Sequence, residues 1–497
     1  MKSKFLFATI LVALLIRLIP TLTTNQPFST DTWPLIRLSR VLLANPEYKI
    51  WDDSLLGGYH NRWPAVILES TLFATLTGLE PAYFFRFVGV IITQTSMLVT
   101  TYALIRRYRG ACTALLSTLT LTSLPSLVIF TSTTLKEVYA YPLALLYVLT
   151  ITEGSLNTLV LTLLIAISLV ASHPLTPLMM IAFLSSYLFV SWVKRLENPF
   201  YSADFRKYLL AFLLLSITYT IYTAFYGWEG LIFKFGLRDF TALFIVGVAV
   251  YGWYVLVEGD FIKSLLILIP GITTILVSNY RFLESSLMLL YVVPFIVLLL
   301  FYMWGRSGES GEAVVAPILL PILVGVQYVV IVSPLLMAIL HRLLNYLFFA
   351  VVAITASLNI RHERTRRYAV AALTISLVIT TLILVNLTFY GDPLAHYWRY
   401  GDREVIGVSN LIKYVSSEKV CGDVKIKYLI NDVVSVDLLC GLRLHESDSG
   451  YPTILYSDNF RFGYVLSPVD THSLRELSTL NSIKNVIYSN GVIYVMR

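Results

Sequence analysis

Runs of about 20 apolar residues recur along most of the chain and constrain its fold more than any other feature. A helix needs roughly 20 such residues to cross a hydrocarbon core ~30 Å thick. Over 497 residues the chain is 57% hydrophobic and 13% charged, which is too little charge to cover the surface of a soluble protein of this length. The sequence therefore predicts a polytopic α-helical membrane protein.

About 13 spans are predicted from these runs, and a small domain follows the last of them. The first run resembles a signal peptide, but no small-residue cleavage site follows it, so we expect it to be retained as a span. We predict a membrane part at residues 1–391, with a first external loop at 23–81, and a small extracytoplasmic α/β domain at 392–497. The predicted spans are residues 5–22, 82–105, 111–130, 138–152, 157–174, 177–193, 208–226, 240–257, 263–278, 286–304, 314–333, 337–360 and 368–389.

The distribution of lysine and arginine predicts the orientation, because cytoplasmic loops carry an excess of both. With the N-terminus in the cytoplasm, the inside segments hold 15 basic residues, including "RRYR" at 106–109 and "RHERTRR" at 361–367. An odd number of spans then places residues 392–497 outside. The predicted localisation is the cell membrane, crossed many times, with a cytoplasmic N-terminus and an extracytoplasmic C-terminal domain.

The net charge of +7 could indicate a nucleic-acid partner, but its location argues against one. Residues 392–497 carry 11 Lys and Arg against 12 Asp and Glu, so the basic excess belongs to the loops between spans. We therefore expect membrane lipids, and no nucleic acid, as partners. The chain has no P-loop, Gly-rich dinucleotide turn, paired CxxC or HExxH motif, which argues against an ATP-driven transporter with its engine in the same chain.

The first external loop and the C-terminal domain show patterns of local structure. "TWPLIRLSRVLLAN" at 32–45 predicts an amphipathic helix lying flat on the membrane, and residues 64–79 predict a second apolar helix that ends at Gly78. In the C-terminal domain, residues 403–417 and 470–480 predict helices. Strands are predicted at 424–430, 433–439, 452–457, 463–467 and, as a hairpin, 486–496.

Three acids are predicted to lie near the outer surface: Asp31 after the first span, Glu137 between spans three and four, and Glu284 between spans nine and ten. In a folded bundle their loops share one face, so the three carboxylates can converge. Such a cluster can bind a divalent cation through oxygen ligands, or one acid can act as a general base. Each acid also has a simpler interpretation. Asp31 can cap the following helix, Glu137 can pair with Lys136 or face solvent, and Glu284 can be an i, i+3 partner of Arg281.

Basic residues and a histidine lie near the same predicted surface. Arg281 and Arg342 can snorkel to the membrane interface, or they can hold a phosphate by charge-assisted hydrogen bonds. His173 lies in the Pro-bracketed segment "SHPLTPL" and is either part of a structural turn or a catalytic residue. Cys421 and Cys440 can form a disulfide if the C-terminal domain is outside the cell.

The order of these features resembles the GT-C superfamily of integral-membrane glycosyltransferases, which includes protein O-mannosyltransferases and the catalytic subunit of oligosaccharyltransferase. In the latter, the first acidic motif reads Asp-Pro-Tyr-Phe-Asn-Tyr-Arg, and "DTWPLIR" keeps its acid at Asp31 and its arginine at Arg37. "LKEVYA" keeps Glu137 of the second motif, with Leu135 in place of that motif's first acid. Glu284 sits comparably to a metal-holding glutamate. The Trp-Trp-Asp-Tyr-Gly signature is missing, and the C-terminal tail resembles that of archaeal members.

The resemblance implies a glycosyltransferase that moves a sugar or glycan from a polyprenyl-phosphate-linked donor to a glycan, lipid or protein acceptor at the extracytoplasmic face. A divalent cation, Mg²⁺ or Mn²⁺, is the one cofactor that the resemblance leaves open. The alternatives are a non-enzymatic flippase or transporter of lipid-linked sugars and a catalytically silent GT-C relative. The implied site residues are Asp31 and Glu137 for catalysis, Arg37, Arg281, Arg342 and His173 for the donor phosphate, and Asp31, Glu137 and Glu284 for the cation.

Overall fold

The computed structural model describes most of the chain, and its contacts divide it into two compact units. One unit contains residues 1–17 and 38–383, and the other contains residues 18–37 and 384–497. The predicted boundary at residue 391 was drawn from hydrophobicity rather than from contacts, and it stays a prediction. The described residues are 2–53, 58–153, 156–197, 204–231, 236–257, 293–294, 296–298, 300–301, 309–329, 342–358, 363–390, 396, 398–412, 419–430, 435–438, 440, 452–462, 464–467, 470–472, 486–489 and 492–496.

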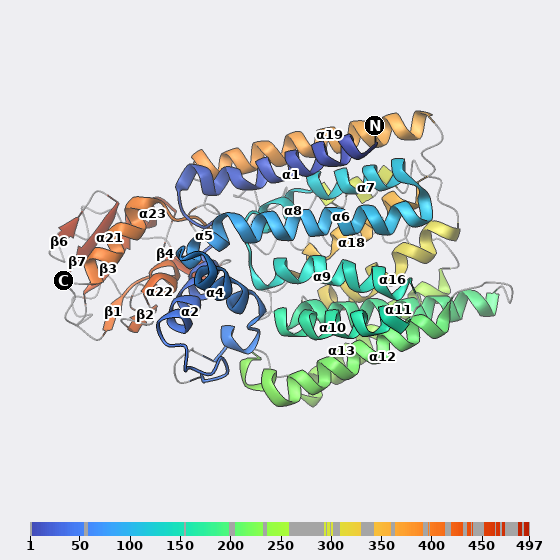
Figure 1. The fold of residues 1–497 in the computed structure, drawn as a ribbon, viewed down its shortest axis with the longest axis horizontal. Coiled ribbons are helices and arrows are strands. Elements are labelled where there is room, and N and C mark those ends of the chain that lie inside the picture. The colour runs from blue at the N-terminus through green and yellow to red at the C-terminus, as the bar shows by residue number, and fades with distance from the viewer. Residues whose placement is uncertain are drawn as a thin grey trace. The chain divides into compact units, whose positions relative to one another are not determined.

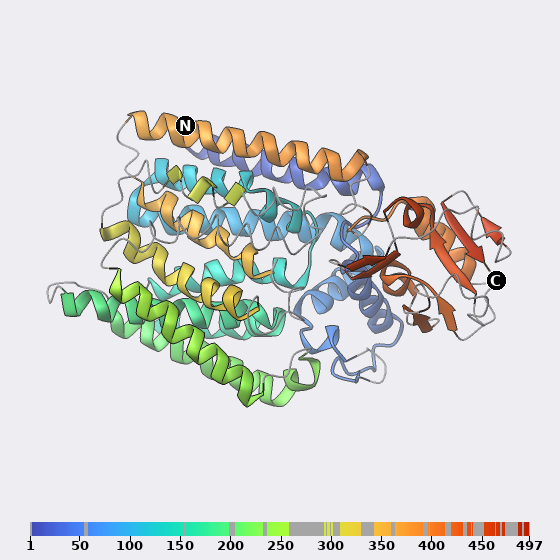
Figure 2. The same cartoon turned by 180° about the vertical axis from the view of Figure 1, so that it is seen from behind.

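The chain is largely helical, and the predicted spans that fall on described residues are helical (Figures 1 and 2). The predicted span at 263–278 lies outside the described residues, as does most of that at 286–304. The helices are α1 (Lys2–Thr24), α2 (Thr32–Ala44), α4 (Ala65–Thr77), α5 (Pro81–Tyr83), α6 (Gly89–Arg109), α7 (Ala111–Ser123), α8 (Pro125–Phe130), α9 (Lys136–Ile151), α10 (Leu156–Ser172), α11 (Leu175–Glu197), α12 (Phe205–Tyr222), α13 (Leu237–Leu256), α16 (Glu309–Gln327), α18 (Leu347–Ser357), α19 (Glu363–Val385), α21 (Asp402–Ile412), α22 (Val424–Ile430) and α23 (Ser457–Phe462), with short 3₁₀ or π turns η1 (His60–Arg62), η2 (Phe84–Val88), η3 (Thr223–Gly227), η4 (Trp228–Gly230) and η8 (Asn386–Tyr390).

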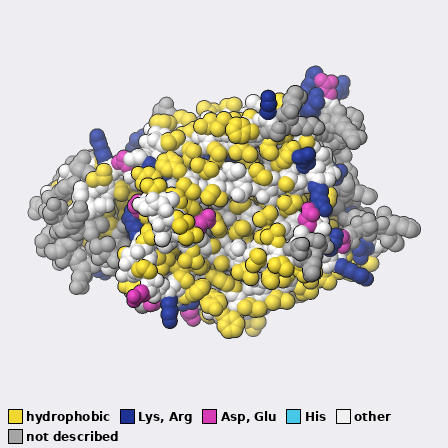
Figure 3. Space-filling view, in the orientation of Figure 1, with side chains coloured by type: hydrophobic (Ala, Val, Ile, Leu, Met, Phe, Trp, Pro, Cys, Tyr) yellow, Lys and Arg dark blue, Asp and Glu magenta, His cyan; other side chains and the backbone are white. Residues whose placement is uncertain are grey.

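Six of the described helices are long and apolar enough to cross a membrane, judged by length and composition, and five shorter apolar helices accompany them. Large apolar side chains on α12 and α13 point out of the protein, with Ile217 57% and Phe244 70% exposed. A broad hydrophobic face covers the helices in Figure 3. Such a surface is stable in lipid and unfavourable in water, so the chain is a multi-pass membrane protein.

The predicted span at 111–130 is one helix broken in two. α7 ends at Ser123, and α8 begins at Pro125. Leu124 between them has extended backbone, with φ −79° and ψ 119°, because the residue before a proline disfavours the helical region. Proline also lacks an N–H group, so the carbonyl four residues earlier, that of Leu121, loses its helical donor.

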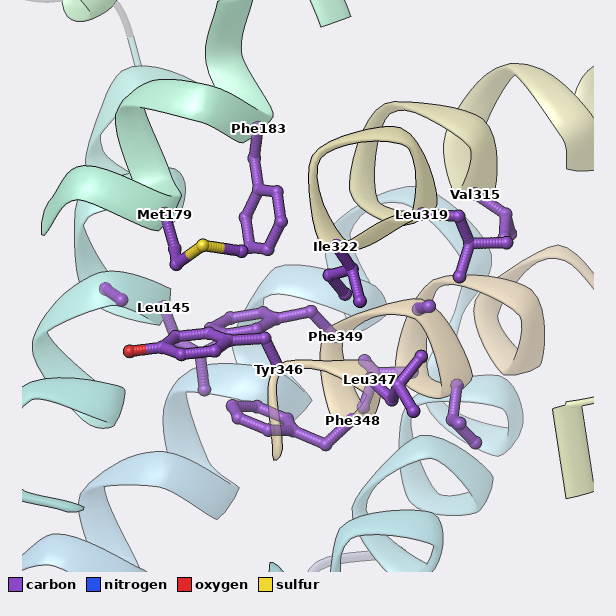
Figure 4. Close-up of a cluster of buried hydrophobic side chains, with 14 of the residues drawn as sticks. Leu145, Met179, Phe183, Val315, Leu319, Ile322, Tyr346, Leu347, Phe348 and Phe349 are labelled. Carbon is purple, nitrogen blue, oxygen red and sulfur yellow. The ribbon is translucent and has the colours of Figure 1, made fainter. Parts of the chain in front are cut away.

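Buried apolar side chains from several helices form the interior of the helical unit. Figure 4 shows Leu145 of α9, Met179 and Phe183 of α11, Ile322 of α16 and Phe349 of α18 packed together. Aromatic rings contact one another in this cluster: the centroids of the Phe183 and Phe349 rings are 5.8 Å apart. The cluster matters for function because it encloses the ring of Tyr346, which carries a hydroxyl into the candidate site.

The two predicted helices of the first external loop are present. α2 begins at Thr32, whose Oγ1 donates to the Phe28 carbonyl at 3.0 Å. α4 ends before Gly78, which has a left-handed backbone with φ 70° and donates its N–H to the Ala74 carbonyl. Glycine adopts this conformation without steric cost, and for that reason it commonly ends helices.

The second unit contains a small mixed sheet whose strand order is β2-β1-β3-β7-β6. β1 runs parallel to β2 and β3, whereas β7 is antiparallel to both β3 and β6. The predicted hairpin at 486–496 is confirmed as β6 and β7. A disulfide joins Cys421 to Cys440, with Cα atoms 5.8 Å apart. The strands are β1 (Lys419–Cys421), β2 (Ser435–Asp437), β3 (Thr453–Tyr456), β4 (Tyr464–Ser467), β5 (Asp470–His472), β6 (Val486–Ser489) and β7 (Ile493–Met496).

Two predictions for this unit were wrong. Residues 424–430 form helix α22 rather than a strand, because Asp423 caps its N-terminus by accepting a hydrogen bond from the Ile426 N–H at 3.0 Å. Residues 470–472 form strand β5, paired antiparallel with β4, where a helix was predicted to begin. The strand was predicted from the alternating apolar residues at 424–430 alone.

The stability of α22 is expected to fall as pH rises above the ordinary range of an aspartate. Burial raises the pKa of Asp423, although Asn459 donates to its carboxylate at 2.8 Å and Lys425 lies nearby. Because the pKa of Asp423 is higher in the folded state, folding favours its protonated form. The contribution of Asp423 to the free energy of unfolding therefore falls as pH rises from about 4 through the raised pKa. Hydrogen exchange of residues 424–430 in the full protein, corrected for intrinsic rates, measures this; Asp423→Asn should flatten the pH dependence. Equal slopes in both proteins would contradict it.

Candidate functional site

The start of α9 places a lysine and a glutamate in the interior of the helical unit. Lys136 and Glu137 are each 6% exposed, so Glu137 does not lie in solvent. Leu135 leads into the helix with extended backbone, and a carboxylate in the first turn is favoured by the helix dipole. Two buried ionisable side chains at the end of an apolar helix are expensive unless other groups stabilise them.

Glu137 is the centre of a hydrogen-bonded cluster that joins three parts of the helical unit. Tyr141, one turn further along α9, donates its hydroxyl to Glu137 Oε1 at 2.7 Å. Tyr346 also hydrogen-bonds Glu137, and its hydroxyl lies 2.8 Å from Thr176 Oγ1. Figure 4 shows the Tyr346 ring packed among apolar side chains, with its hydroxyl pointing out of that cluster.

His173 completes this cluster from the turn between α10 and α11. It is 1% exposed, its Nδ1 lies 3.0 Å from Thr176 Oγ1, and the Thr176 N–H donates to the same nitrogen at 3.3 Å. Nδ1 therefore accepts, and the ring proton of neutral imidazole resides on Nε2. The buried His173 ring faces the positive charges of Arg342 and Lys136, which disfavour a further positive charge on it. The histidine is thus a neutral hydrogen-bonding group.

Arg342 belongs to the same cluster. It lies five residues before α18 begins at Leu347, and its charge acts on His173, Tyr141 and Tyr346. Of the predicted site residues, the structure thus brings Glu137, His173 and Arg342 together. Lys136, which the sequence interpretation considered only as a partner of Glu137, joins them.

Two aromatic rings from the segment between α2 and α4 cover the Lys136 ammonium. Its Nζ lies 4.0 Å from the centroid of the Tyr59 ring and 5.6 Å from that of Trp63. Aromatic faces attract a cation and restrict its motion, while leaving it able to bind an anion. This segment is itself anchored, since Arg62 Nε donates to Asp53 Oδ1 at 2.9 Å and holds the pKa of Asp53 below its usual range.

Sequence reading missed a further carboxylate, Glu69 of α4. Tyr139, three residues after Lys136, hydrogen-bonds Glu69, and Glu69 Oε2 is buried with no hydrogen-bond partner among the described residues. A single acid inside the apolar run 64–79 was the available signal. A buried carboxylate oxygen of this kind accepts a hydrogen bond from a substrate hydroxyl or a water.

Asp31 and Arg37 lie in the other unit, where Trp398, Asp402 and Tyr428 contact their segment. Ser29 donates its N–H to the Trp398 carbonyl at 2.7 Å and has a left-handed backbone with φ 79°. Such conformations persist where the surroundings enforce them, and they gather at functional sites. Arg37 Nη1 donates to the Tyr428 carbonyl at 3.1 Å.

Neighbouring contacts fix the same segment from its two ends. Asn25 Nδ2 donates to Asp402 Oδ2 at 3.1 Å, and Gln26 Nε2 donates to Asp402 Oδ1 at 2.5 Å. The ring of Trp33 meets that of Tyr400 edge to face, with centroids 5.6 Å apart. The carboxylate of Asp31 is therefore carried by a constrained turn rather than by a loose loop.

Two predicted site residues, Arg281 and Glu284, lie outside the described residues. Among the described ones, no group of three or more His, Cys, Asp and Glu side chains is arranged to hold a metal ion. Because Asp31 and Glu137 belong to different units, their predicted convergence stays a prediction, as does the cation.

The described cluster of the helical unit has a definite chemistry. Lys136 and Arg342 contribute two positive charges, Glu137 contributes one negative charge, and His173 is neutral. In a low-dielectric interior such a group attracts an anion far more strongly than in water. Hydroxyls of Tyr141 and Tyr346 and the imidazole of His173 add hydrogen-bonding groups, and Glu137 supplies a carboxylate that can accept a proton.

Comparison with known proteins identifies the fold. No protein-family model and no curated protein sequence matches the chain. Among solved structures, the oligosaccharyltransferase of Archaeoglobus fulgidus, crystallised with Zn and sulfate, matches with a TM-score of 0.52 over 92% of this chain and 68% of that one, at 12% identity. ArnT from Cupriavidus metallidurans matches over 99% of this chain and 98% of its own, with TM-scores of 0.40 bound to undecaprenyl phosphate and 0.41 in the apo state, at 12% and 11% identity. The chain thus has a GT-C-like fold, as its sequence predicted.

Proposed function

We propose that this protein is a glycosyltransferase that moves a sugar or glycan from a polyprenyl-phosphate-linked donor to an acceptor at the extracytoplasmic face. The observation that carries the proposal is the cluster of the buried Lys136 and Glu137 with the half-buried Arg342 in a membrane protein with a GT-C-like fold. Its net positive charge suits a phosphate that arrives within the membrane on a lipid. A phosphate bound between a lysine and an arginine receives charge-assisted hydrogen bonds from both.

The donor phosphate is assigned to Lys136 and Arg342, with Arg281 and Arg37 as the further predicted contacts. During transfer the phosphate becomes the leaving group and gains negative charge. Fixed cations and hydrogen-bond donors in a site without water stabilise this charge without reorganising. Tyr59 and Trp63, which cover Lys136, exclude water from the cation on one side.

Proton abstraction from the acceptor is assigned to Asp31 or Glu137. A carboxylate within hydrogen-bond reach of the acceptor hydroxyl or amide is the group that this chemistry needs. Glu69 is suited to bind a hydroxyl of the sugar or of the acceptor, because its Oε2 is buried and accepts no hydrogen bond from the described residues. His173 serves as a neutral donor through Nε2.

A divalent cation fits this proposal through ligand chemistry. The predicted cation would be held by the carboxylates of Asp31, Glu137 and Glu284, whose oxygens are the ligands that Mg²⁺ and Mn²⁺ prefer. Bound there, the cation would neutralise charge on the leaving phosphate.

The proposed orientation has the N-terminus in the cytoplasm and the C-terminal domain outside. The lysine and arginine content of the loops supports it. The disulfide between Cys421 and Cys440 also supports it, because disulfides persist mainly in extracytoplasmic compartments. The site would then face the outer leaflet, where lipid-borne donor and external acceptor meet.

Replacing Lys136 with methionine tests the assignment of the donor phosphate. Met keeps the aliphatic body under Tyr59 and Trp63 and removes the charge, so affinity for dolichyl phosphate in nanodiscs should fall about 10- to 100-fold, the value of one or two hydrogen bonds to a charged group. Lys207→Met, at an exposed lysine paired with Asp204, is the matched control. Unchanged affinity in Lys136→Met would exclude the lysine from the phosphate site.

The proposed activity itself is tested with purified protein in vesicles that contain a labelled dolichyl-phosphate sugar and a membrane-protein and lipid extract as acceptor. A glycosyltransferase moves the label from the donor to another molecule. A flippase moves the intact donor between leaflets and leaves the label on it. A donor that is neither consumed nor moved, in protein that binds dolichyl phosphate, would indicate a silent relative.

A further inference from the structure

Arg17 of α1 is a charged residue buried in the middle of an apolar helix, and the mechanism above does not use it. It is 0% exposed. Its Nε donates to Thr131 Oγ1 at 2.7 Å, Nη2 to the Leu121 carbonyl at 3.1 Å and Nη1 to the carbonyl of Ala13 at 3.2 Å. These hydrogen bonds, which the described residues provide, all go to neutral oxygen atoms.

Stability does not account for a guanidinium in this place. Burying a charge costs several kcal/mol, and replacing buried charges by apolar side chains of similar volume is often neutral or stabilising. Charged residues within membrane spans are accordingly rare and tend to be functional. What the guanidinium supplies, and an apolar side chain cannot, is a fixed geometry between the oxygens that it joins.

The first of these oxygens is freed by the break between α7 and α8. The carbonyl of Leu121 has no helical donor, since Pro125 lacks an N–H group, and Arg17 donates to it instead. At the same break, Ser376 and Thr380 of α19 each donate to the carbonyl of Ser123 at 2.7 Å. Figure 1 shows α1, α7, α8 and α19 in this part of the helical unit.

The second oxygen connects Arg17 to the candidate site. Thr131 follows α8 directly, and its hydroxyl also donates to the Leu127 carbonyl at 2.6 Å. Five residues after Thr131 the chain enters α9 with Lys136, and Glu137 follows. The backbone from Thr131 to Leu135 is therefore held at its beginning by Arg17 and at its end by the Glu137 cluster.

We infer that Arg17 is a positioning residue that sets the turn at 131–135 and thereby the placement of Lys136 and Glu137. The inference rests on the proposed function in so far as these two residues bind donor and acceptor. A misplacement of about 1 Å in a reacting group can lower a rate about 100-fold. Arg17 acts through Thr131 and touches no reacting group itself.

The test uses Arg17→Met and Arg17→Lys in the full protein, with two measurements. Hydrogen exchange of residues 131–137 should speed up in Arg17→Met, while the melting temperature stays equal or rises. The rate of sugar transfer should fall about tenfold or more at saturating dolichyl-phosphate sugar, and Arg17→Lys should restore it only in part, because a lysine cannot reach both oxygens in a fixed fork. Thr380→Val is the matched control: it removes a cap from the same break without touching the turn.

A double-mutant cycle with Thr131→Val shows whether Arg17 acts through this residue. The two changes should be non-additive, so the double variant should transfer sugar about as slowly as Arg17→Met alone. Additive effects, unaltered exchange at 131–137, or normal transfer in Arg17→Met would each overturn the inference. A different result would separate this inference from the proposed function. If the wild-type protein transfers no sugar, the proposed function is contradicted. Faster exchange at 131–137 in Arg17→Met would still show that Arg17 positions this turn.

Discussion

Replacing Asp31 with alanine is expected to lower the rate of sugar transfer about a thousandfold or more, with the protein still folded. General-base catalysis contributes about 10²- to 10⁴-fold, and a lost cation ligand has an effect of similar size. Folding should survive because the turn around Asp31 is held mainly by other groups: the Ser29 N–H bonded to Trp398, and Asn25 and Gln26 bonded to Asp402. Transfer of labelled sugar from a dolichyl-phosphate donor in membranes measures the loss.

Asp31→Asn separates the two roles of this carboxylate. If Asp31 is the base, the dependence of the residual rate on added Mn²⁺ should match that of wild type, and the acidic limb of the pH profile should disappear. If it is a cation ligand, the concentration of Mn²⁺ needed for half-maximal transfer should rise. Glu47→Gln, at an exposed acid of the same external loop, is the control. Undiminished transfer in Asp31→Ala would remove this residue from the mechanism.

The helical framework was predictable because it depends on length and hydrophobicity alone. A run of about 20 apolar residues must be helical in lipid, where every backbone group has to be satisfied within the segment. Gly78 and the hairpin pattern at 486–496 are equally direct signals, and the elements that they delimit are present as predicted. The Leu124–Pro125 break was available from the sequence in the same way but was read as part of one span.

The candidate site was predictable only in its components. Glu137 was singled out because acids are scarce in the membrane part, His173 because of its Pro-bracketed turn, and Arg342 because it lies near the end of a span. No spacing in the sequence indicates that Tyr346 links Glu137 to Thr176 and His173. Such a link depends on how α9, α11 and α18 pack, which apolar side chains determine. Glu69 was missed for the opposite reason, since a lone acid in an apolar helix has several interpretations until its neighbour Tyr139 is known.

Local propensity also misled where a tertiary contact decided the outcome. Residues 424–430 alternate apolar and polar side chains, which is typical of a strand, but Val424, Lys425 and Ile426 are all buried in succession. Asp423 caps this segment as a helix and is itself enclosed by Asn459. The positions of a buried lysine and a buried aspartate depend on partners from other elements. The sequence pattern of residues 424–430 alone therefore could not predict their helical structure.

The second large effect is expected for Glu137→Gln, which should bind the donor lipid more tightly and transfer its sugar about a thousandfold more slowly. Glutamine has almost the shape of glutamate and can still accept the hydrogen bond from Tyr141, so packing is preserved. Removing the negative charge of Glu137 beside Lys136 and Arg342 makes the cluster more attractive to a phosphate, and dolichyl phosphate should bind roughly threefold more tightly or better. Transfer should nevertheless fail, because the amide cannot take a proton or hold a cation.

These opposite changes separate Glu137 from a merely structural residue. A structural role predicts that binding and transfer weaken together, since breaking a buried charged cluster loosens everything near it. Tyr141→Phe is the matched control: it removes one hydrogen bond to Glu137 and keeps the carboxylate, so transfer should fall only about tenfold, with unchanged affinity for dolichyl phosphate. If Glu137→Gln instead loses affinity for the lipid phosphate while Tyr141→Phe does not, Glu137 acts in donor binding through a cation, and the direct electrostatic assignment of the phosphate to Lys136 and Arg342 is incorrect.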